Sequence, residues 1–416
     1  MNLFKTGFIN AAAVLARAVT SIILNKLSAL ALGPQGFVVF GNFQTLISLL
    51  QGIGNGVIYT GSTKLLAERE IDSQFSAVIV KTAIYMSLIG GGGGLLLLLI
   101  AKRLIIDVSC LGGADCSNAT SILILFLPAI FLVATFTGYF NGSGHIAHLV
   151  AGNVIASMLA LSIGVFFIQH YGAEGTFLAV LGTAVVPIIV YPVFLLKTKG
   201  LIRDIYAVKP SFHIAKRILP YLYSALGSAI IPALSLIFIR STLTSELGET
   251  AAGTWQALWR FSELYIAPLT STLSVYFLPR FSSLATKSQV RSEFGKSLLI
   301  LLGIMMIISS TIIYLDEWLI SVVFSSAFNG VVALLPLQLI GDFLKIAGWL
   351  MGFLMLAKGR SGIYLVAELV FAAFFCGVTV YLIPSSGIQA APIAYIAAYS
   401  AYFSFSYISM RMLRHI

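Results

Sequence analysis

Charged residues are scarce in this 416-residue chain: Asp, Glu, Lys and Arg together make up 10%, hydrophobic residues make up 59%, and the mean hydropathy is +0.98. A soluble domain usually carries about 25% charged residues, so the deficit excludes an ordinary soluble protein and predicts one that lives in lipid. The net charge of +10 could suggest nucleic acid in a soluble chain. Here the loop positions of the cations explain it, and we expect no nucleic-acid partner.

Motifs that carry chemistry are also missing. The sequence has no nucleophile elbow, zinc motif, P-loop or dinucleotide fingerprint, so we expect no enzyme, no metal site and no bound cofactor. Without a Walker motif, an ATP-driven pump is disfavoured. The first apolar run after Lys5 continues to about Leu32 without a small-residue cleavage site, which indicates a first spanning helix and not a cleaved signal peptide.

Cysteine is rare as well, with three residues in the chain. Cys110 and Cys116 fall in a loop that the topology below places outside the cytoplasm. There the two cysteines could form a disulfide or remain free thiols, and the sequence does not decide between these states. No histidine lies close enough in sequence to favour a metal site.

What is abundant is long apolar runs. A spanning helix needs about 20 mostly apolar residues, and the runs divide into twelve. We expect spans near residues 6–32, 37–66, 77–101, 119–141, 147–169, 174–196, 218–243, 250–277, 296–315, 333–357, 362–383 and 389–410.

Lysine and arginine in the loops set the orientation. With a cytoplasmic N-terminus, eighteen of the 25 basic residues flank the inner side and two, Lys102 and Arg103, the outer side. Cytoplasmic loops retain Lys and Arg, so both termini are expected in the cytoplasm. The basic connection at residues 200–217 is expected to link an N-terminal six-helix bundle, residues 1–199, to a C-terminal one, residues 218–416.

Three landmarks recur at nearly one offset. They are Leu32-Gly33 with Leu247-Gly248, the segment 41–44 with 253–256, and the segment 172–175 with 387–390. Three repeats in order suggest two copies of one unit. Six helices per copy is an even number, so the copies are expected to be parallel repeats with a cavity between them. The predicted fold class is an all-α polytopic membrane protein with twelve transmembrane helices in two pseudo-symmetric six-helix bundles.

Charges inside the predicted spans point to a site. Gln256, Arg260 and Glu263 share one helical face at i, i+4 and i+7, and Gln338, Asp342 and Lys345 repeat the spacing with the signs reversed. A charge at the bilayer centre costs roughly 2.5–3.5 kcal/mol on insertion scales, so such faces should line a bundle interior or a wet cavity. Pairing of Arg260 with Glu263, and of Asp342 with Lys345, is the structural alternative.

Other intramembrane polar residues extend this site. Five cations, Arg17, Lys26, Arg240, Arg260 and Lys345, outnumber the acids Glu263, Asp342 and Glu368 by two, and a surplus of buried positive charge favours an anion such as phosphate. The three acids are candidates for H⁺ or Na⁺ coupling. For Lys26 and Arg240, snorkelling to the interface is the alternative.

The second span carries a polar face of Gln44, Ser48, Gln51, Asn55, Tyr59 and Ser62, spaced at close to 3.6 residues and therefore expected to be one continuous stripe. Its amides and hydroxyls suit sugar hydroxyls. Hydrogen bonding between helices is the alternative.

The sequence resembles a known family at several segments: the Leu-Gly-Pro-x-Gly turn at residues 32–36, the segment 273–279, the segment 338–345, and Leu356-Ala-Lys358 with Glu368 beyond it. These are similar to the Wzx-type polysaccharide flippases of the MATE/MurJ-like (MOP) superfamily, over the whole chain. Compared with those relatives, Arg17 replaces a common Lys, Glu263 replaces an Asp, and Arg260 stands where a small polar residue is expected.

The resemblance implies translocation of an undecaprenyl-pyrophosphate-linked oligosaccharide, an O-antigen or enterobacterial common antigen unit, across the bacterial inner membrane. It implies alternating access, with the lumen cations and Gln44, Gln51, Asn55 and Gln256 as substrate ligands. A polysaccharide polymerase and a chain-length regulator are possible partners. A MATE-type multidrug exporter is the alternative, although it predicts a lumen richer in carboxylates than in cations. A membrane polymerase or ligase is disfavoured because no outer loop exceeds about 18 residues.

Overall fold

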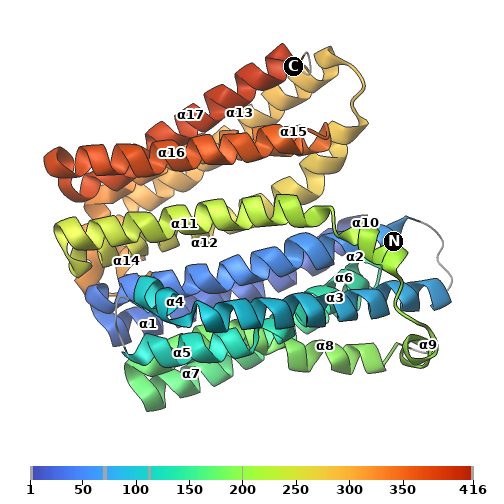
Figure 1. Ribbon diagram of the computed structural model, residues 1–416. Coiled ribbons are helices and arrows are strands. Elements are labelled where there is room, and N and C mark those ends of the chain that lie inside the picture. Colours follow the sequence, from blue (N-terminus) through green and yellow to red (C-terminus); the bar gives the residue numbers. More distant parts are fainter. Residues whose placement is uncertain (1–2, 69–72, 111–113, 199, 414–416) are drawn as a thin grey trace. The chain divides into compact units, whose positions relative to one another are not determined.

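The computed structural model describes residues 3–68, 73–110, 114–198 and 200–413, all as helices and connecting turns, with no strand in those ranges (Figure 1). Of the eighteen inner-side cations, Arg69, Lys199 and Arg414 lie outside the described residues. Side chains before Ala13, and most of those between residues 271 and 279, also lie outside them.

The first half of the chain contains α1 (Leu3–Gly54), the π-helix η1 (Asn55–Tyr59), α2 (Thr60–Ala67), α3 (Ser73–Ile100), α4 (Lys102–Cys110), α5 (Ala114–Leu125), α6 (Leu127–Gly142), α7 (Ile146–Val185) and α8 (Pro187–Leu196). Two short helices follow, α9 (Leu201–Ala207) and α10 (Phe212–Ile218). The second half contains α11 (Tyr221–Leu247), α12 (Glu249–Ser283), α13 (Lys287–Tyr314), α14 (Asp316–Val323), the 3₁₀ helix η2 (Ser326–Leu334), α15 (Leu335–Ala357), α16 (Ser361–Ser386), the 3₁₀ helix η3 (Gly387–Gln389) and α17 (Ala390–Met412).

Within the described residues, seven helices are long and apolar enough to cross a membrane, or eight when α5 and α6, bent by 55°, count as one span. Three of the seven run for 55, 51 and 52 residues, more than twice the length that one crossing needs, and a glycine with positive φ breaks each of them. Counting these three as pairs gives eleven. The 35-residue helix α12, whose polar residues keep it out of that set, is the twelfth. The predicted fold class is confirmed.

The breaks support the predicted internal repeat. Gly33 (φ 60°) and Gly172 (φ 53°) break α1 and α7, while Gly248 (φ 86°) precedes α12 and Gly387 (φ 53°) follows α16. The offsets, 248 minus 33 and 387 minus 172, are both 215. Glycine adopts positive φ without the steric cost of a Cβ, so these residues end one span and start the next at matching places in each half.

The chain forms two compact units. Unit 1 comprises residues 1–31 and 39–233, and unit 2 comprises residues 32–38 and 234–416. The start of α11 packs with unit 1, since Ala225 touches Gly56 of η1. In unit 2, Phe37 packs edge-on against Phe324 and Phe328. The division into residues 1–199, 200–217 and 218–416 stays a prediction.

A disulfide joins Cys110 at the end of α4 to Cys116 in α5, which settles the alternative left open by the sequence. The hydroxyl of Thr120 lies 3.3 Å from the Cys110 sulfur. Cys376, in α16, is a free thiol.

Candidate functional site

In unit 1, Arg17 of α1 is held by a neutral group. Its guanidinium donates to the side-chain oxygen of Asn153 in α7, and that oxygen also accepts a hydrogen bond of 2.8 Å from the hydroxyl of Tyr191 in α8. The Arg17 side chain is exposed and forms no ion pair with any described residue. Its full positive charge therefore remains available to a ligand.

Tyr59 extends this group. Its hydroxyl accepts a 2.7 Å hydrogen bond from the Asn141 amide in α6, and Arg17 interacts electrostatically with both Tyr59 and Tyr191. We call Arg17, Tyr59, Asn141, Asn153 and Tyr191 the Arg17 cluster. It combines one cation with amides and phenols, donors and acceptors that suit phosphate oxygens and sugar hydroxyls.

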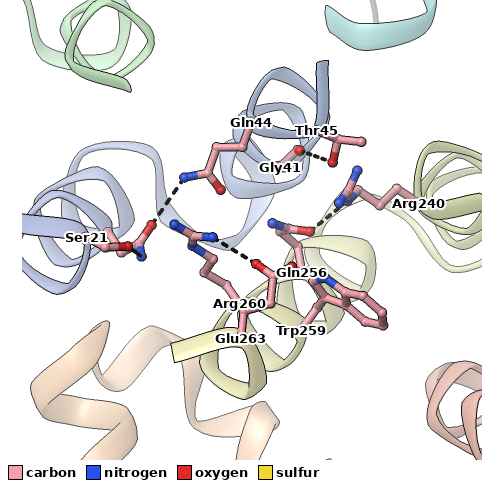
Figure 2. Close-up of polar contacts among 10 residues, drawn as sticks. Ser21, Gly41, Gln44, Thr45, Arg240, Gln256, Trp259, Arg260 and Glu263 are labelled. Atoms are coloured by element: carbon pink, nitrogen blue, oxygen red, sulfur yellow. Dashed lines mark hydrogen bonds and ion pairs between the residues drawn. The ribbon is translucent and has the colours of Figure 1, made fainter. Parts of the chain in front are cut away.

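The polar face of the second span is present but interrupted. Gln44 donates to Asn25 at 3.4 Å (Figure 2). Gln51 is half-buried and Asn55 is exposed. Asn55 begins the π-helix η1, whose extra residue turns the helix that follows. Ser62 is consequently buried, with its hydroxyl bonded to the Ile58 carbonyl at 2.6 Å. The predicted continuous stripe is wrong at Ser62, because a 3.6-residue period holds only in a regular helix, whereas Tyr59 still reaches the Arg17 cluster.

Lys26 is half-buried on α1. Its assignment as a lumen cation or as a snorkelling residue stays open.

In unit 2, Arg240 of α11 is 1% exposed, and its Nε donates at 2.7 Å to the side-chain oxygen of Gln256 in α12 (Figure 2). Buried this deeply, Arg240 does not snorkel to the interface. An arginine with five N–H donors can hold a neutral amide and still bind an anion.

Arg260 and Glu263 pair with each other, 2.8 Å apart, one turn along α12 (Figure 2). Glu263 also accepts a 3.0 Å hydrogen bond from the Trp259 indole. The pairing proposed as the structural alternative therefore exists for these two residues, and it reduces the charge surplus of unit 2.

Asp342 and Lys345 behave differently. Asp342 of α15 is fully buried, and its oxygens accept hydrogen bonds from Ser262 at 2.8 Å, from Tyr395 of α17 at 2.9 Å, and from Tyr265. No ion pair joins it to Lys345 among the described residues. The carboxyl group is held by hydroxyls, and it interacts with Lys345 electrostatically without a direct ion pair.

Lys345 lies among aromatic rings. Its Nζ is 4.8 Å from the ring centre of Trp349, 5.0 Å from that of Trp259 and 5.8 Å from that of Tyr395, and the residue is 4% exposed. Ring faces attract a cation without neutralising it. Gln338 donates to Asp342 at 3.4 Å and Asp342 interacts electrostatically with Lys345, as residues on one helical face would.

Glu368 of α16 is 9% exposed and interacts with the hydroxyl of Tyr364. The side chain is therefore largely enclosed by the protein.

Sequence reasoning missed Asn141, Asn153, Tyr191, Ser262, Tyr265 and Tyr395. Asn153 lies in an apolar run, and its one polar neighbour at helical spacing is Ser157, at i+4. The available signal was this short polar pair, since an intramembrane polar residue requires a partner.

Comparisons with known proteins agree with this picture. No protein-family model matches the chain. Several solved MATE structures share its fold: an inward-facing multidrug-resistance MATE transporter of the MOP superfamily aligns with a TM-score of 0.77 and 17% identity over 97% of this chain and 95% of that one. A MOP transporter from Pyrococcus furiosus, whose structure is described as having a binding pocket of reverse polarity, aligns with a TM-score of 0.69 and 15% identity over 97% and 96% of the two chains.

The fold is that of the MATE transporters of the MOP superfamily, and the chain is a multi-pass membrane protein. By sequence, the chain is 27% identical over 413 residues to the lipid III flippases of Escherichia coli K12 and Shigella flexneri, covering 97% of this chain and 97% of each relative. The resemblance to the Wzx-type flippases is confirmed.

Proposed function

We propose that this protein is a flippase that moves a lipid-linked oligosaccharide, carried on undecaprenyl pyrophosphate, from the cytoplasmic to the periplasmic leaflet of the inner membrane. The observation that carries the proposal is the 27% identity to lipid III flippases across 97% of both chains. O-antigen and common antigen units share the pyrophosphate and differ in their sugars. The proposal covers both classes of glycan.

Several cations suit the pyrophosphate. Arg17 is held by the neutral Asn153, and Lys345 lies among aromatic rings. Neither forms an ion pair among the described residues, and Lys345 interacts at longer range with Asp342, Glu263 and Glu368. Arg240, Lys26 and Arg260 are assigned as further phosphate ligands. Desolvated arginine and lysine bind phosphate oxygens through charge-assisted hydrogen bonds.

The amides are assigned to the sugars. Gln44, Gln51, Asn55 and Gln256 each offer both a donor and an acceptor, which matches a hydroxyl group. With sugar held by amides and diphosphate held by cations, alternating access would carry the head group across while the lipid tail stays in the bilayer.

Asp342 is the leading candidate for ion coupling, with Glu368 and Glu263 as further candidates. Beside Asp342, the side-chain oxygen of Gln338 is buried and has no hydrogen-bond partner among the described residues. An acceptor left in that position favours an incoming proton donor or Na⁺.

The distribution of the loop cations supports a cytoplasmic location for both termini. We also expect contacts with a polysaccharide polymerase and a chain-length regulator.

The test is expression in cells that lack their own flippase, with the surface polysaccharide measured on a gel and lipid-linked units assayed for their accessibility at the periplasmic face. We expect surface polysaccharide to be restored. The proposal fails if the protein is inserted and stable while lipid-linked units stay cytoplasmic. Resistance to cationic drugs without restored polysaccharide would favour the multidrug exporter.

A further inference from the structure

The connection between the two halves is a structured segment. Leu201 of α9 and Ile214 and Ile218 of α10 are buried. Lys81 of α3 donates to the Val208 carbonyl at 2.7 Å, and the backbone N–H of Ser211 donates to the Thr82 hydroxyl at 2.9 Å. Apolar and polar contacts therefore fix one face of α9 and α10 against α3, inside unit 1.

The opposite face combines aromatic and basic side chains. Tyr206 is 82% exposed and Phe212 is 75% exposed. Arg203, Lys209 and Lys216 are exposed beside them and form no ion pair among the described residues. We call these five residues the linker surface. Residues 197–217 contain six basic residues and one acid, Asp204, while Arg217 is already paired with Glu68.

The attachment to α3 sets the depth of this surface. α3 has 28 residues, about 42 Å at 1.5 Å per residue, which matches a bilayer of about 40–45 Å with its headgroups. Lys81 is the ninth residue of α3, about 12 Å from its start. Each headgroup layer is about 5–8 Å thick. The segment bonded to Lys81 and Thr82 therefore lies within the first third of a spanning helix, close to the boundary between headgroups and hydrocarbon.

We propose that the linker surface binds the headgroups of anionic phospholipids. Tyrosine and phenylalanine rings are stable at the boundary of headgroups and acyl chains, and each basic residue near an anionic surface strengthens binding roughly fivefold. The positive charge of the surface complements the phosphates, and its exposed rings complement the acyl chains next to them. A soluble anion could bind the positive charges, but it has no acyl chains to contact the exposed rings.

The test uses the full-length protein in mixed micelles of phosphatidylglycerol and phosphatidylcholine. Phosphatidylglycerol retained after detergent washing is counted by native mass spectrometry. R203Q/K209Q/K216Q removes the three unpaired cations of the surface. Its matched control, K287Q/R291Q/K296Q, removes three exposed cations from α13. We expect the first variant to bind phosphatidylglycerol at least tenfold more weakly and the control to match the wild type.

A second variant, Y206A/F212A, keeps every charge and removes two exposed rings, so it tests the surface even if the charge variant folds poorly. It should also lose phosphatidylglycerol, and inorganic pyrophosphate should compete weakly. Equal loss in both triple variants would show that only total charge matters. Wild-type retention in the linker variants, or full competition by pyrophosphate, would also overturn the proposal. Because no readout depends on transport, a failure here leaves the proposed flippase activity untouched.

Discussion

The side-chain oxygen of Asn153 accepts hydrogen bonds from both Arg17 and Tyr191, residues of three different helices. An aspartate in place of the asparagine would hold the guanidinium equally well. It would, however, cancel the charge that we assign to the pyrophosphate. The neutrality of this partner is the feature to test.

Asn153→Asp should reduce polysaccharide export about as strongly as Arg17→Ala, while membrane insertion and melting temperature stay near those of the wild type. The physical reason is that a carboxylate 3 Å from a guanidinium competes with a bound phosphate for the same donors. Surface polysaccharide in flippase-deficient cells is the measurement.

Asn118→Asp is the matched control. It is the same isosteric change at an exposed residue of α5, whose side chain donates to Glu174 at 3.4 Å, and exposed charges interact weakly. It should export normally. If Asn153→Asp exports like the wild type, Arg17 does not act through its charge.

Much of the fold was predictable because lipid imposes strict requirements on sequence. The lengths of the apolar runs located the spans. The repeated landmarks, Gly33 with Gly248 and Gly172 with Gly387, proved to be glycines with positive φ between successive helical segments. The π-helix at Asn55–Tyr59 was not predictable. Its effect on Ser62 comes from one added residue in a turn, which no periodic pattern reveals.

The sequence identified many polar residues of the candidate site but fewer of the residues to which they bind. Arg260 and Glu263 lie one turn apart, so their pairing follows from helical spacing. Asp342 has the same spacing to Lys345 but is bonded to Ser262, Tyr265 and Tyr395 on other helices. Helix-to-helix packing decides such contacts, and a single sequence does not encode it locally.

Gly253→Ala should destabilise the protein, because a Cβ at Gly253 would lie 1.7 Å from the Pro34 carbonyl oxygen. Backbone at both positions must then move, at a cost of about 1–3 kcal/mol or more. The melting temperature in detergent is the measurement. Gly303→Ala is the control, since nothing lies within 4 Å of its added methyl, and it should melt at or slightly above the wild-type temperature. Equal melting of both variants would mean that α12 and the turn at Pro34 are less tightly packed than described.

Removal of the disulfide should lower stability modestly. Cys110 and Cys116 enclose a short loop, for which chain entropy gives about 2 kcal/mol. Cys110→Ser/Cys116→Ser should therefore melt lower than the wild type, and reductant should bring the wild type to the same value. Cys376→Ser should change neither result, because Cys376 is a free thiol. A reductant effect that survives in the double variant would contradict this account.

Stability should fall in mild acid through His145. Burial lowers the pKa of His145, and the neighbouring His148 lowers it further. A histidine whose folded pKa is depressed binds its proton more readily when unfolded, so its contribution is complete above the unfolded pKa of about 6.5 and is lost as the pH falls below that value. His145→Gln should therefore show a smaller drop in melting temperature between pH 7.5 and 5.5 than the wild type. His170→Gln, an exposed histidine of α7, is the control, and an unchanged slope in His145→Gln would reject the assignment.

Asp342→Asn should uncouple transport from its driving ion. The carboxylate accepts hydrogen bonds through both oxygens, whereas an asparagine offers one oxygen and turns an N–H₂ group toward hydroxyls that already donate. In proteoliposomes with an imposed pH or Na⁺ gradient, wild-type flipping of a lipid-linked glycan should accelerate severalfold, and the variant should show the same rate with and without the gradient. Gln338→Leu removes the neighbouring orphaned oxygen and the long 3.4 Å hydrogen bond from Gln338 to the carboxylate, which keeps the shorter bonds from Ser262, Tyr265 and Tyr395. It should weaken the gradient dependence and leave the gradient-free rate intact. A variant that loses both rates together would indicate that Asp342 holds the bundle together through Tyr265 and Tyr395, and the coupling role would pass to Glu368.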